Sequence, residues 1–205
     1  REDGFYNQAT IIVKSPLNCI PQNIKLFKNS SISMTGCKKK IDGKNSVQIV
    51  VDKMNEFNNL MNNNVMKYEY YDYSITLINS DYSIKENNED NFTINRGKLY
   101  DILKNRYKLF VTYTPDIYPG VKVYYYWNSN NKLRDGLCYC AKNCENKKKR
   151  ELDENSCKRI TIAIFQSGKI IITGSNRITQ IKHAYSMINK IILKNHNVLR
   201  RYIIG

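Results

Sequence analysis

The feature that most constrains this chain is a stretch rich in β-branched residues, positions 160–174. Its two apolar halves are joined by a short polar connection at positions 166–169, which contains Gly168. Two β-branched runs joined in this way are typical of a β-hairpin. Apolar residues then recur at helical spacing, which predicts an amphipathic helix packed on the hairpin. These helical positions are Ile178, Ile181, Ala184, Tyr185, Ile188, Ile191 and Ile192.

The same hairpin and helix occur a second time near the start of the sequence. A constant offset places residues 24–36 on residues 162–174, with Phe27 on Phe165 and Gly36 on Gly174. Self-similarity at a fixed offset indicates a repeated structural unit. We therefore expect a duplicated chain, with one repeat over residues 1–64 and a second over residues 65–205. The helical face of the first copy would comprise Val47, Val50, Val51, Met54 and Phe57.

Further strands and helices are predicted around the two hairpins from apolar alternation and turn residues. In the first half we expect strands at residues 8–14, 23–27 and 32–35, a turn at 16–21 and a helix at 46–61. In the second half we expect one long or two short strands within 68–84, a helix at 97–105, and strands at 108–113 and 121–127. Residues 128–157 are poor in apolar side chains and form an insertion relative to the first copy.

The charge balance favours a polyanionic partner. Thirty-three Lys and Arg residues stand against eighteen Asp and Glu residues, a formal charge of +15. Such an excess favours nucleic acid through the release of counterions, although a solvated basic surface would give the same composition. No apolar run reaches membrane-spanning length, and residues 1–14 lack the apolar centre of a signal peptide. We therefore expect an intracellular, soluble protein.

Four of the six cysteines gather in the polar insertion: Cys138, Cys140, Cys144 and Cys157. In a reducing compartment, such clustering favours a metal site over disulfides. Four thiolates would complete a tetrahedral Zn²⁺ site and leave no open position for water, so the site would be structural. Disulfides and unpaired thiols are the alternatives. Cys19 and Cys37 lie beside predicted strands and are interpreted as packing residues.

No arrangement of residues predicts catalysis. His183 lies on the predicted second helix and His196 beyond it, and neither has a Ser or Cys nucleophile placed near it by spacing. The Ser167-Gly-Lys sequence lacks the preceding Gly of a phosphate-binding P-loop. We therefore expect a binding protein rather than an enzyme.

Three motifs, in order, resemble the TATA-box-binding protein family. The hairpin at residues 164–174 has the family pattern Ile-Phe-x-Ser-Gly-Lys-x-x-x-Thr-Gly. Residues 113–120, Tyr-Thr-Pro-Asp-Ile-Tyr-Pro-Gly, resemble the family loop Tyr-Glu-Pro-Glu-Leu-Phe-Pro-Gly. Residues 92–99, Phe-Thr-Ile-Asn-Arg-Gly-Lys-Leu, are similar to Phe-Pro-Ile-Arg-Leu-Glu-Gly-Leu. The richness in Asn, Lys and Ile and the Cys-rich insertion resemble the divergent homologues of large nucleocytoplasmic DNA viruses.

The resemblance implies an α+β fold built as a duplicated saddle. Its curved antiparallel sheet would carry helices on the convex face and DNA on the concave face, and its first repeat would be incomplete at the N-terminus. Since strand side chains alternate between faces, residues spaced by two should share the DNA face. In the second copy these are Ala163, Phe165, Ile171 and Thr173, and in the first copy Lys25, Phe27, Ser33 and Thr35. The complementary residues, Ile162, Ile164, Ile170 and Ile172, should meet the helices.

The family also pushes paired aromatic side chains between base steps of the minor groove, which bends the duplex. By resemblance, the pairs here are Phe27 with Phe5 and Phe165 with Tyr118; the alternative is that these side chains belong to an ordinary core. Three residues of the hairpin turns are expected phosphate contacts, with a merely solvated turn as the alternative. They are Lys169, Ser167 and Asn29.

The loop containing Thr114, Asp116 and Ile117 matches the family's stirrup, which engages transcription factor IIB. The alternative is a tight turn made by Pro115, Pro119 and Gly120 without a partner. The implied function is a transcription initiation factor that binds and bends A·T-rich promoter DNA and works with a factor IIB-like protein and RNA polymerase. It would require no cofactor.

Two other functions remain open from the residues alone. One is a nonspecific architectural or accessory nucleic-acid-binding module, and the other is a protein-interaction scaffold that has lost DNA binding. For the transcription factor, the resemblance implies action in a viral replication compartment of the host cytoplasm or in the host nucleus.

Overall fold

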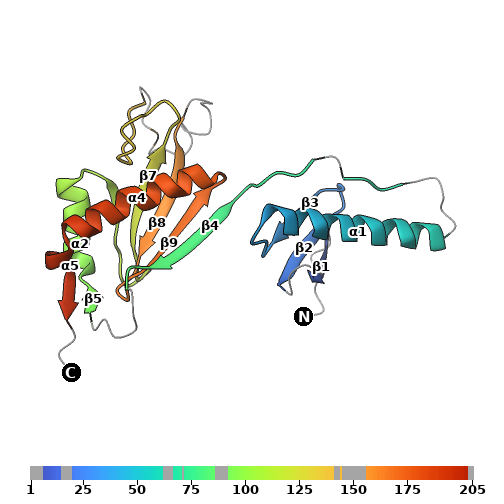
Figure 1. Ribbon diagram of the computed structural model, residues 1–205, viewed down its shortest axis with the longest axis horizontal. Helices are drawn as coiled ribbons and strands as arrows, with labels where there is room; N and C mark the ends of the chain where they lie inside the picture. Colours follow the sequence, from blue (N-terminus) through green and yellow to red (C-terminus); the bar gives the residue numbers. More distant parts are fainter. Residues whose placement is uncertain are drawn as a thin grey trace. The chain divides into compact units, whose positions relative to one another are not determined.

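The computed structural model describes residues 7–14, 20–61, 67–70, 72–85, 92–140, 144 and 156–202. The chain divides into two units, Arg1–Ser74 and Ile75–Gly205, each with its own antiparallel sheet and long helix (Figure 1). The predicted repeat boundary at residues 64 and 65 lies outside the described residues and stays a prediction. The expected turn at 16–21 falls largely outside them as well, as do Phe5 and Cys19.

Unit 1 is a three-stranded meander with one helix. Its strands pair in the order β1-β2-β3, and Ile24 at the centre lies opposite Ile11 and Met34. Because alternate strand residues share a face, Val13 and Ile24 are buried together with a residue of the helix, Val50. The elements are β1 (Gln8–Lys14), β2 (Pro21–Phe27), β3 (Ile32–Thr35) and α1 (Lys40–Leu60).

Helix α1 differs from the sequence prediction in where it begins and in the burial of a residue near its C-terminal end. It begins at Lys40, ahead of the expected residue 46, because a carboxylate oxygen of Asp42 accepts the Lys39 backbone N–H at 3.1 Å and caps the first turn. That turn is polar, so the apolar period could not reveal it. Phe57, expected on the buried face, is 63% exposed, whereas Val47, Val50 and Val51 are buried as expected.

Unit 2 contains a five-stranded antiparallel sheet in the order β4-β9-β8-β7-β6. Its strands are β4 (Ile78–Ser83), β6 (Phe110–Thr112), β7 (Val121–Trp127), β8 (Lys158–Ile164) and β9 (Lys169–Ser175). Its helices are α2 (Arg96–Asp101), the π-helical turn η1 (Ile102–Arg106), α4 (Ile178–Lys194) and α5 (His196–Leu199). Strands β5 (Phe92–Ile94) and β10 (Arg200–Tyr202) pair separately. The strand expected within 68–84 is confirmed only at Ile78–Ser83.

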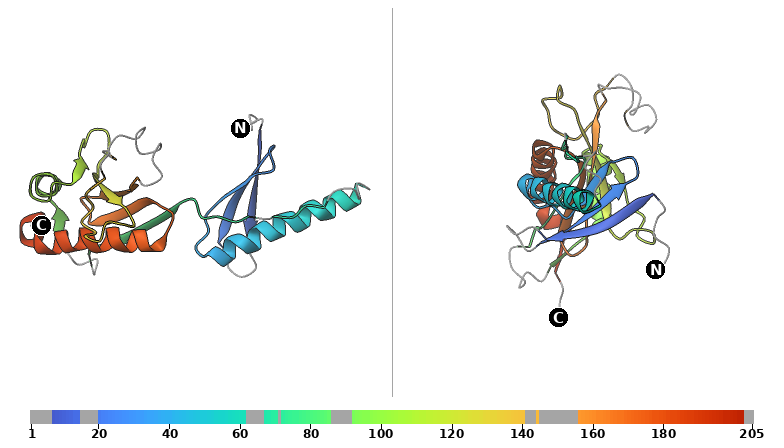
Figure 2. Two further views of the ribbon diagram at one scale, coloured as in Figure 1. Left: turned by 90° about the horizontal axis from the view of Figure 1, so that it is seen from above. Right: turned by 90° about the vertical axis from the view of Figure 1, so that its right-hand side faces the viewer.

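Helix α4 covers one face of this sheet (Figures 1 and 2). The four isoleucines expected to meet the helices, Ile162, Ile164, Ile170 and Ile172, are completely buried. Each such side chain contributes about 1.5–3 kcal/mol relative to an exposed one, so this layer is a substantial part of the apolar stabilisation of the unit. On the helix side, Ala184, Ile188 and Ile191 are buried as expected, but Ile178 and Tyr185 are exposed.

The two meanders share their strand register under the offset that relates their sequences. Ile24 pairs with Met34 and Ile162 with Ile172, its equivalent pair. The turn after the second strand reaches positive φ at Ser30 (65°) in unit 1 and at Gly168 (86°) in unit 2. Register and turn conformation thus repeat together in the two units, in line with the offset found in the sequence.

A glycine ends each hairpin in the left-handed region, Gly36 at φ 91° and Gly174 at φ 90°. We predict that Gly174→Ala lowers the free energy of unfolding of unit 2 by about 1–2 kcal/mol, the usual cost of that conformation for a residue with a Cβ. The added Cβ would also lie 3.1 Å from the Arg159 carbonyl oxygen. Guanidinium unfolding followed by fluorescence measures this, because the single tryptophan, Trp127, lies in unit 2 and donates to His183 Nδ1 at 3.1 Å.

Gly97→Ala is the matched control. Gly97 lies in α2, and its added Cβ would have only one neighbour, at 3.7 Å. A helical alanine should leave stability unchanged or raise it by up to about 1 kcal/mol. Equal unfolding midpoints for Gly174→Ala and the unaltered protein would contradict the prediction.

Candidate nucleic-acid interface

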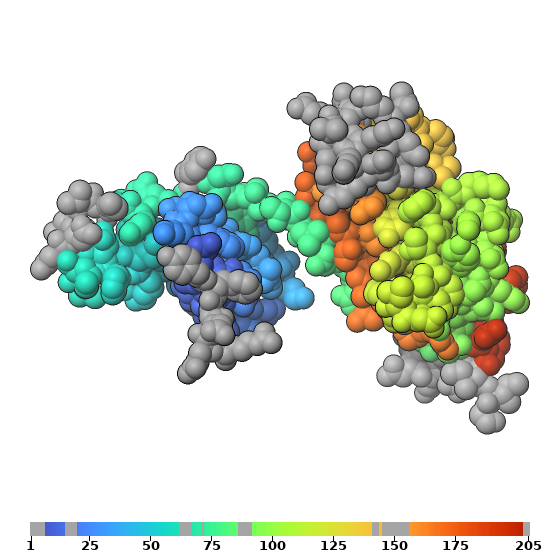
Figure 3. All heavy atoms as spheres, turned by 180° about the vertical axis from the view of Figure 1, so that it is seen from behind, coloured from blue at the N-terminus to red at the C-terminus, as the bar shows by residue number. Residues whose placement is uncertain are grey.

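The sheet of unit 2 has a second face, opposite to α4, which we call the open face. Strand alternation and the observed register place the predicted DNA-facing residues on it in cross-strand rows. One row runs Lys122, Ala163, Ile171 and Asp81, and a second runs Tyr124, Thr161 and Thr173. Seen from behind, the yellow and orange segments of β7 and β8 reach the surface (Figure 3). Ile171 and Thr173 are half-buried, while Ala163 is only 6% exposed.

The predicted aromatic pair of the second repeat is present at one end of this face. The rings of Tyr118 and Phe165 lie with their centroids 5.8 Å apart and tilted by 56°. Gly120 makes this approach possible, because a Cβ there would lie 2.9 Å from Tyr118 Cε1 and 3.2 Å from Phe165 Cε1. The Lys122 ammonium lies over the Tyr118 ring at 3.7 Å. Both rings are half-buried, so part of each is available to a ligand.

The loop at residues 113–120 is held beside this pair by hydrogen bonds. The Thr114 carbonyl accepts the backbone N–H groups of Ile117 at 3.0 Å and Tyr118 at 2.9 Å. Arg96 donates to the Pro119 carbonyl and, at 2.9 Å, to Gln166 Oε1 in the neighbouring turn. The three predicted partner-binding residues of the loop are all exposed: Thr114, Asp116 and Ile117. Ile117 is 84% exposed. The sequence analysis gave Arg96 no role, since only the fold brings it to this loop.

The predicted phosphate contacts lie in the hairpin turns, where each has an internal partner. Lys169 Nζ lies 3.4 Å from an Asp81 carboxylate oxygen, and both side chains are more than half exposed. Exposed pairs of this kind contribute little stability, so phosphate could compete for the ammonium. Ser167 Oγ accepts the Lys169 N–H at 3.4 Å. In the other turn, Asn29 Oδ1 accepts the Ser31 N–H at 3.2 Å and therefore braces the turn itself.

The corresponding face of unit 1 is more polar. Lys25 pairs with Ser33, and Phe27 pairs with Gln8. Phe27 and Lys25 are half-buried, while Ser33 and Thr35 are exposed. The proposed partner of Phe27, Phe5, lies outside the described residues.

A second aromatic pair on the open face of unit 2 escaped the sequence analysis. The rings of Phe110 and Tyr124 lie 5.2 Å apart, and the Arg159 guanidinium lies 5.0 Å from the Tyr124 ring centre. Alternation along residues 121–127 places Tyr124 on the same face as Lys122, but its neighbours depend on the pairing of β6 with β7. The open face thus combines exposed aromatic surface with basic groups.

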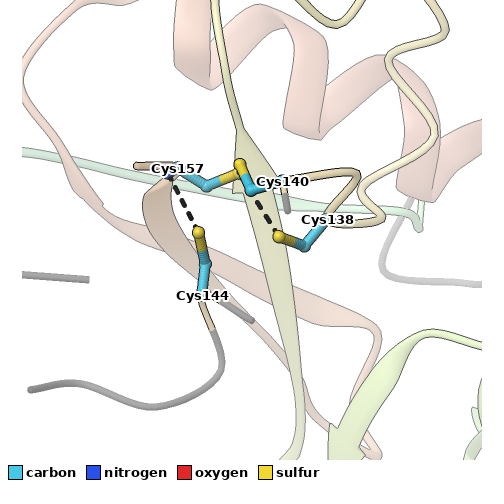
Figure 4. A group of neighbouring side chains, drawn as sticks. All are labelled: Cys138, Cys140, Cys144 and Cys157. Carbon is cyan, nitrogen blue, oxygen red and sulfur yellow. Dashed lines mark hydrogen bonds between the residues drawn. The ribbon is translucent and has the colours of Figure 1, made fainter. Parts of the chain in front are cut away.

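The four insertion cysteines come together as predicted (Figure 4). Their Sγ atoms all lie within 4.8 Å of one another. Cys157 Sγ is 3.5 Å from Cys140 Sγ and 3.8 Å from Cys138 Sγ. The structure has no disulfide at these four residues or at Cys37, so it does not support the disulfide alternative at these positions.

Burial raises the pKa of Cys144 to about 11 and raises that of Cys157 further. Burial would also raise the pKa of Cys138, but hydrogen bonds from the backbone of Cys140 and Cys144, together with those of the Cys144 and Cys157 side chains, outweigh it and lower that pKa. The cluster therefore contains neighbouring thiols whose pKa values are shifted in opposite directions.

Comparison with known proteins gives this arrangement a family. The family model for transcription factor TFIID, or TATA-binding protein, matches residues 96–195, which lie in unit 2. Residues 96–195 are therefore similar to the TATA-binding-protein family. This is a family of transcription factors, not of enzymes, and the resemblance carried by the three sequence motifs is confirmed.

The chain is also similar to a viral protein. A TATA-box-binding protein-like protein of Acanthamoeba polyphaga mimivirus is 29% identical over 216 aligned positions, which cover 96% of this chain. The chain spans about half the length of that relative, 50%. In the parts of the chain that the structure describes, no helix has the length and apolarity needed to cross a membrane.

Proposed function

We propose that this protein binds A·T-rich promoter DNA through the minor groove and bends it. The observation that carries the proposal is the Tyr118 and Phe165 ring pair, placed at the end of an open sheet face within the region similar to the TATA-binding-protein family. Apolar rings that enter a base step unstack it and kink the duplex, and flexible A·T-rich steps deform at the lowest cost. The cross-strand rows that contain Ala163, Ile171 and Thr173 would then lie along the widened groove.

Basic groups around the open face would supply the phosphate contacts. Lys122 and Lys169 flank the ring pair, and the formal charge of +15 favours any polyanion. Phosphate contacts position a protein without reading sequence, so selectivity would come from the deformability of the bound steps. The smaller and more polar surface of unit 1, with Lys25, Ser33 and Thr35, would contribute less apolar contact.

The duplicated saddle is part of this proposal. Both units have the same meander register, which supports this, and in each the sheet face that the resemblance assigns to DNA would bind the duplex. The proposed DNA binding uses no cofactor; the cysteine cluster would serve as a structural metal site. The protein would act where its promoters are, in a viral replication compartment or in the host nucleus.

Replacing Phe165 tests ring insertion. With 2-aminopurine placed at the kinked step of a TATA duplex, the unaltered protein should raise the probe's fluorescence by unstacking it. Phe165→Ala should abolish this rise and weaken binding at least about tenfold, since the wedge is lost. Tyr185→Ala is the matched control, because this exposed aromatic residue lies on α4, across the sheet from the open face.

The other candidate functions give different outcomes in this assay. If the protein were a nonspecific basic module, the unaltered protein and both variants would bind DNA with nearly the same affinity. That affinity would fall as salt rises, and no unstacking would be seen. A scaffold that has lost DNA binding would bind no duplex. Either result in the unaltered protein would contradict the proposal, and the Trp127 unfolding midpoint shows whether a variant is folded.

We also propose that the loop at residues 113–120 binds a factor IIB-like protein, which would connect the promoter complex to RNA polymerase. Ile117 is the most exposed apolar residue of this loop, and Asp116 beside it supplies the negative charge. Arg96 hydrogen-bonds the loop and the neighbouring turn, which would reduce the ordering cost of binding a partner.

Ile117→Asp should therefore abolish a supershift of the DNA complex by a recombinant transcription factor IIB core domain. DNA bending should be unchanged, since Ile117 is 84% exposed and is not among the open-face rows. Leu133→Asp, at an exposed apolar residue of the insertion, is the control. A supershift that survives Ile117→Asp would contradict this contact.

A further inference from the structure

We infer that Cys138, Cys140, Cys144 and Cys157 bind one structural Zn²⁺, which pins the insertion onto the open face of the sheet. This inference does not depend on DNA binding. It rests on the spacing of the four sulfur atoms, on the kind of ligands they offer, and on the position of the cluster relative to β7 and β8.

The sulfur spacing fits a tetrahedral metal site. With Zn–S bonds of about 2.3 Å, the sulfur atoms of a regular tetrahedron lie about 3.8 Å apart. Cys157 Sγ lies 3.5 Å from Cys140 Sγ and 3.8 Å from Cys138 Sγ, close to that edge length. A disulfide would require about 2.05 Å. The cluster is therefore already shaped for an ion of this size.

The ligand set selects the type of ion. Four thiolates are soft donors that favour Zn²⁺ over Mg²⁺ or Ca²⁺, which prefer oxygen. Four protein ligands close the coordination shell, so the site would hold the fold together and would not activate water. Two donors already point at the sulfur atoms: the Cys157 N–H lies 3.4 Å from Cys144 Sγ, and Asn128 Nδ2 lies 3.8 Å from Cys140 Sγ. Such hydrogen bonds orient metal ligands.

The position of the cluster shows what the ion would hold together. Tyr126 belongs to the open-face side of β7, opposite Arg159, yet it is only 3% exposed. Its ring is covered by Cys144 and Cys157, with Cys138 and Cys140 packed around them. Cys157 directly precedes β8, so the cluster lies where β7 and β8 separate into the insertion (Figure 4).

The beginning of the insertion is held by the core, and its cysteines pack against the sheet. The Tyr126 N–H donates to the Gly136 carbonyl at 3.0 Å, and Tyr125 and Leu109 closely surround Gly136. Beyond Leu137, the four cysteines form a cluster with Tyr126 of β7. An ion that joins Cys138 and Cys140 to Cys157 would close this polar segment, which lacks the apolar residues for a core of its own.

Metal analysis and cobalt substitution test the site on the full chain. We expect about one zinc per purified chain, and Co²⁺ should give the d–d and sulfur charge-transfer absorption of tetrahedral thiolate coordination. Cys140→Ser should lower metal affinity at least about tenfold. Cys37→Ser, a change in unit 1 outside the cluster, should leave stoichiometry and spectrum unchanged.

Amide hydrogen exchange on the unaltered protein tests the structural role and does not require a folded variant. Chelation of the metal should speed exchange at Cys157, whose N–H lies 3.4 Å from Cys144 Sγ, at least about tenfold, while Ile162 and Ile172 in the core stay protected. Absence of bound zinc and of a cobalt spectrum would overturn the site. Unchanged exchange at Cys157 after the metal is removed would overturn its role in pinning the insertion.

Discussion

The packing of the β8 and β9 isoleucines against α4 is the interaction on which the rest of unit 2 depends. Ile162, Ile164, Ile170 and Ile172 lose all contact with water on the helix side. Because the side-chain period of a strand is two, fixing these residues inward also fixes Ala163, Phe165, Ile171 and Thr173 outward. A register slip by one residue would exchange the two sets. Core packing therefore determines which side chains are presented to a ligand.

The two units use the same register with unequal cores. The core cluster of unit 1 has three buried apolar residues, Val13, Ile24 and Val50, whereas that of unit 2 draws on several strands and helices. At positions equivalent to Ile160 and Ala184, unit 1 buries Gln22 and Ser46. An apolar groove of about 520 Å³ also runs between β1 and α1. Unit 2 thus supplies most of the apolar stabilisation and the more apolar open face.

The sequence predicted what depends on period and on repetition. The bounds of β1, β3 and β7 and the alternation in β8 and β9 follow from local patterns. The start of α1 was missed because Asp42 caps a polar turn. Gly120 and Arg96 were given no role, because the ring pair and the loop that they support are assembled by tertiary contacts. The spacing of the cysteines suggested a metal site but not its place beside Tyr126.

DNA bending by the unaltered protein tests the central claim most directly. Fluorescence resonance energy transfer between the ends of a TATA duplex and of a G·C-rich duplex of equal length would be measured across a salt series. The account predicts a bend on the TATA duplex that survives moderate salt, because ring insertion does not rely on counterion release alone. Equal, unbent binding to both duplexes that is lost as salt rises would contradict it.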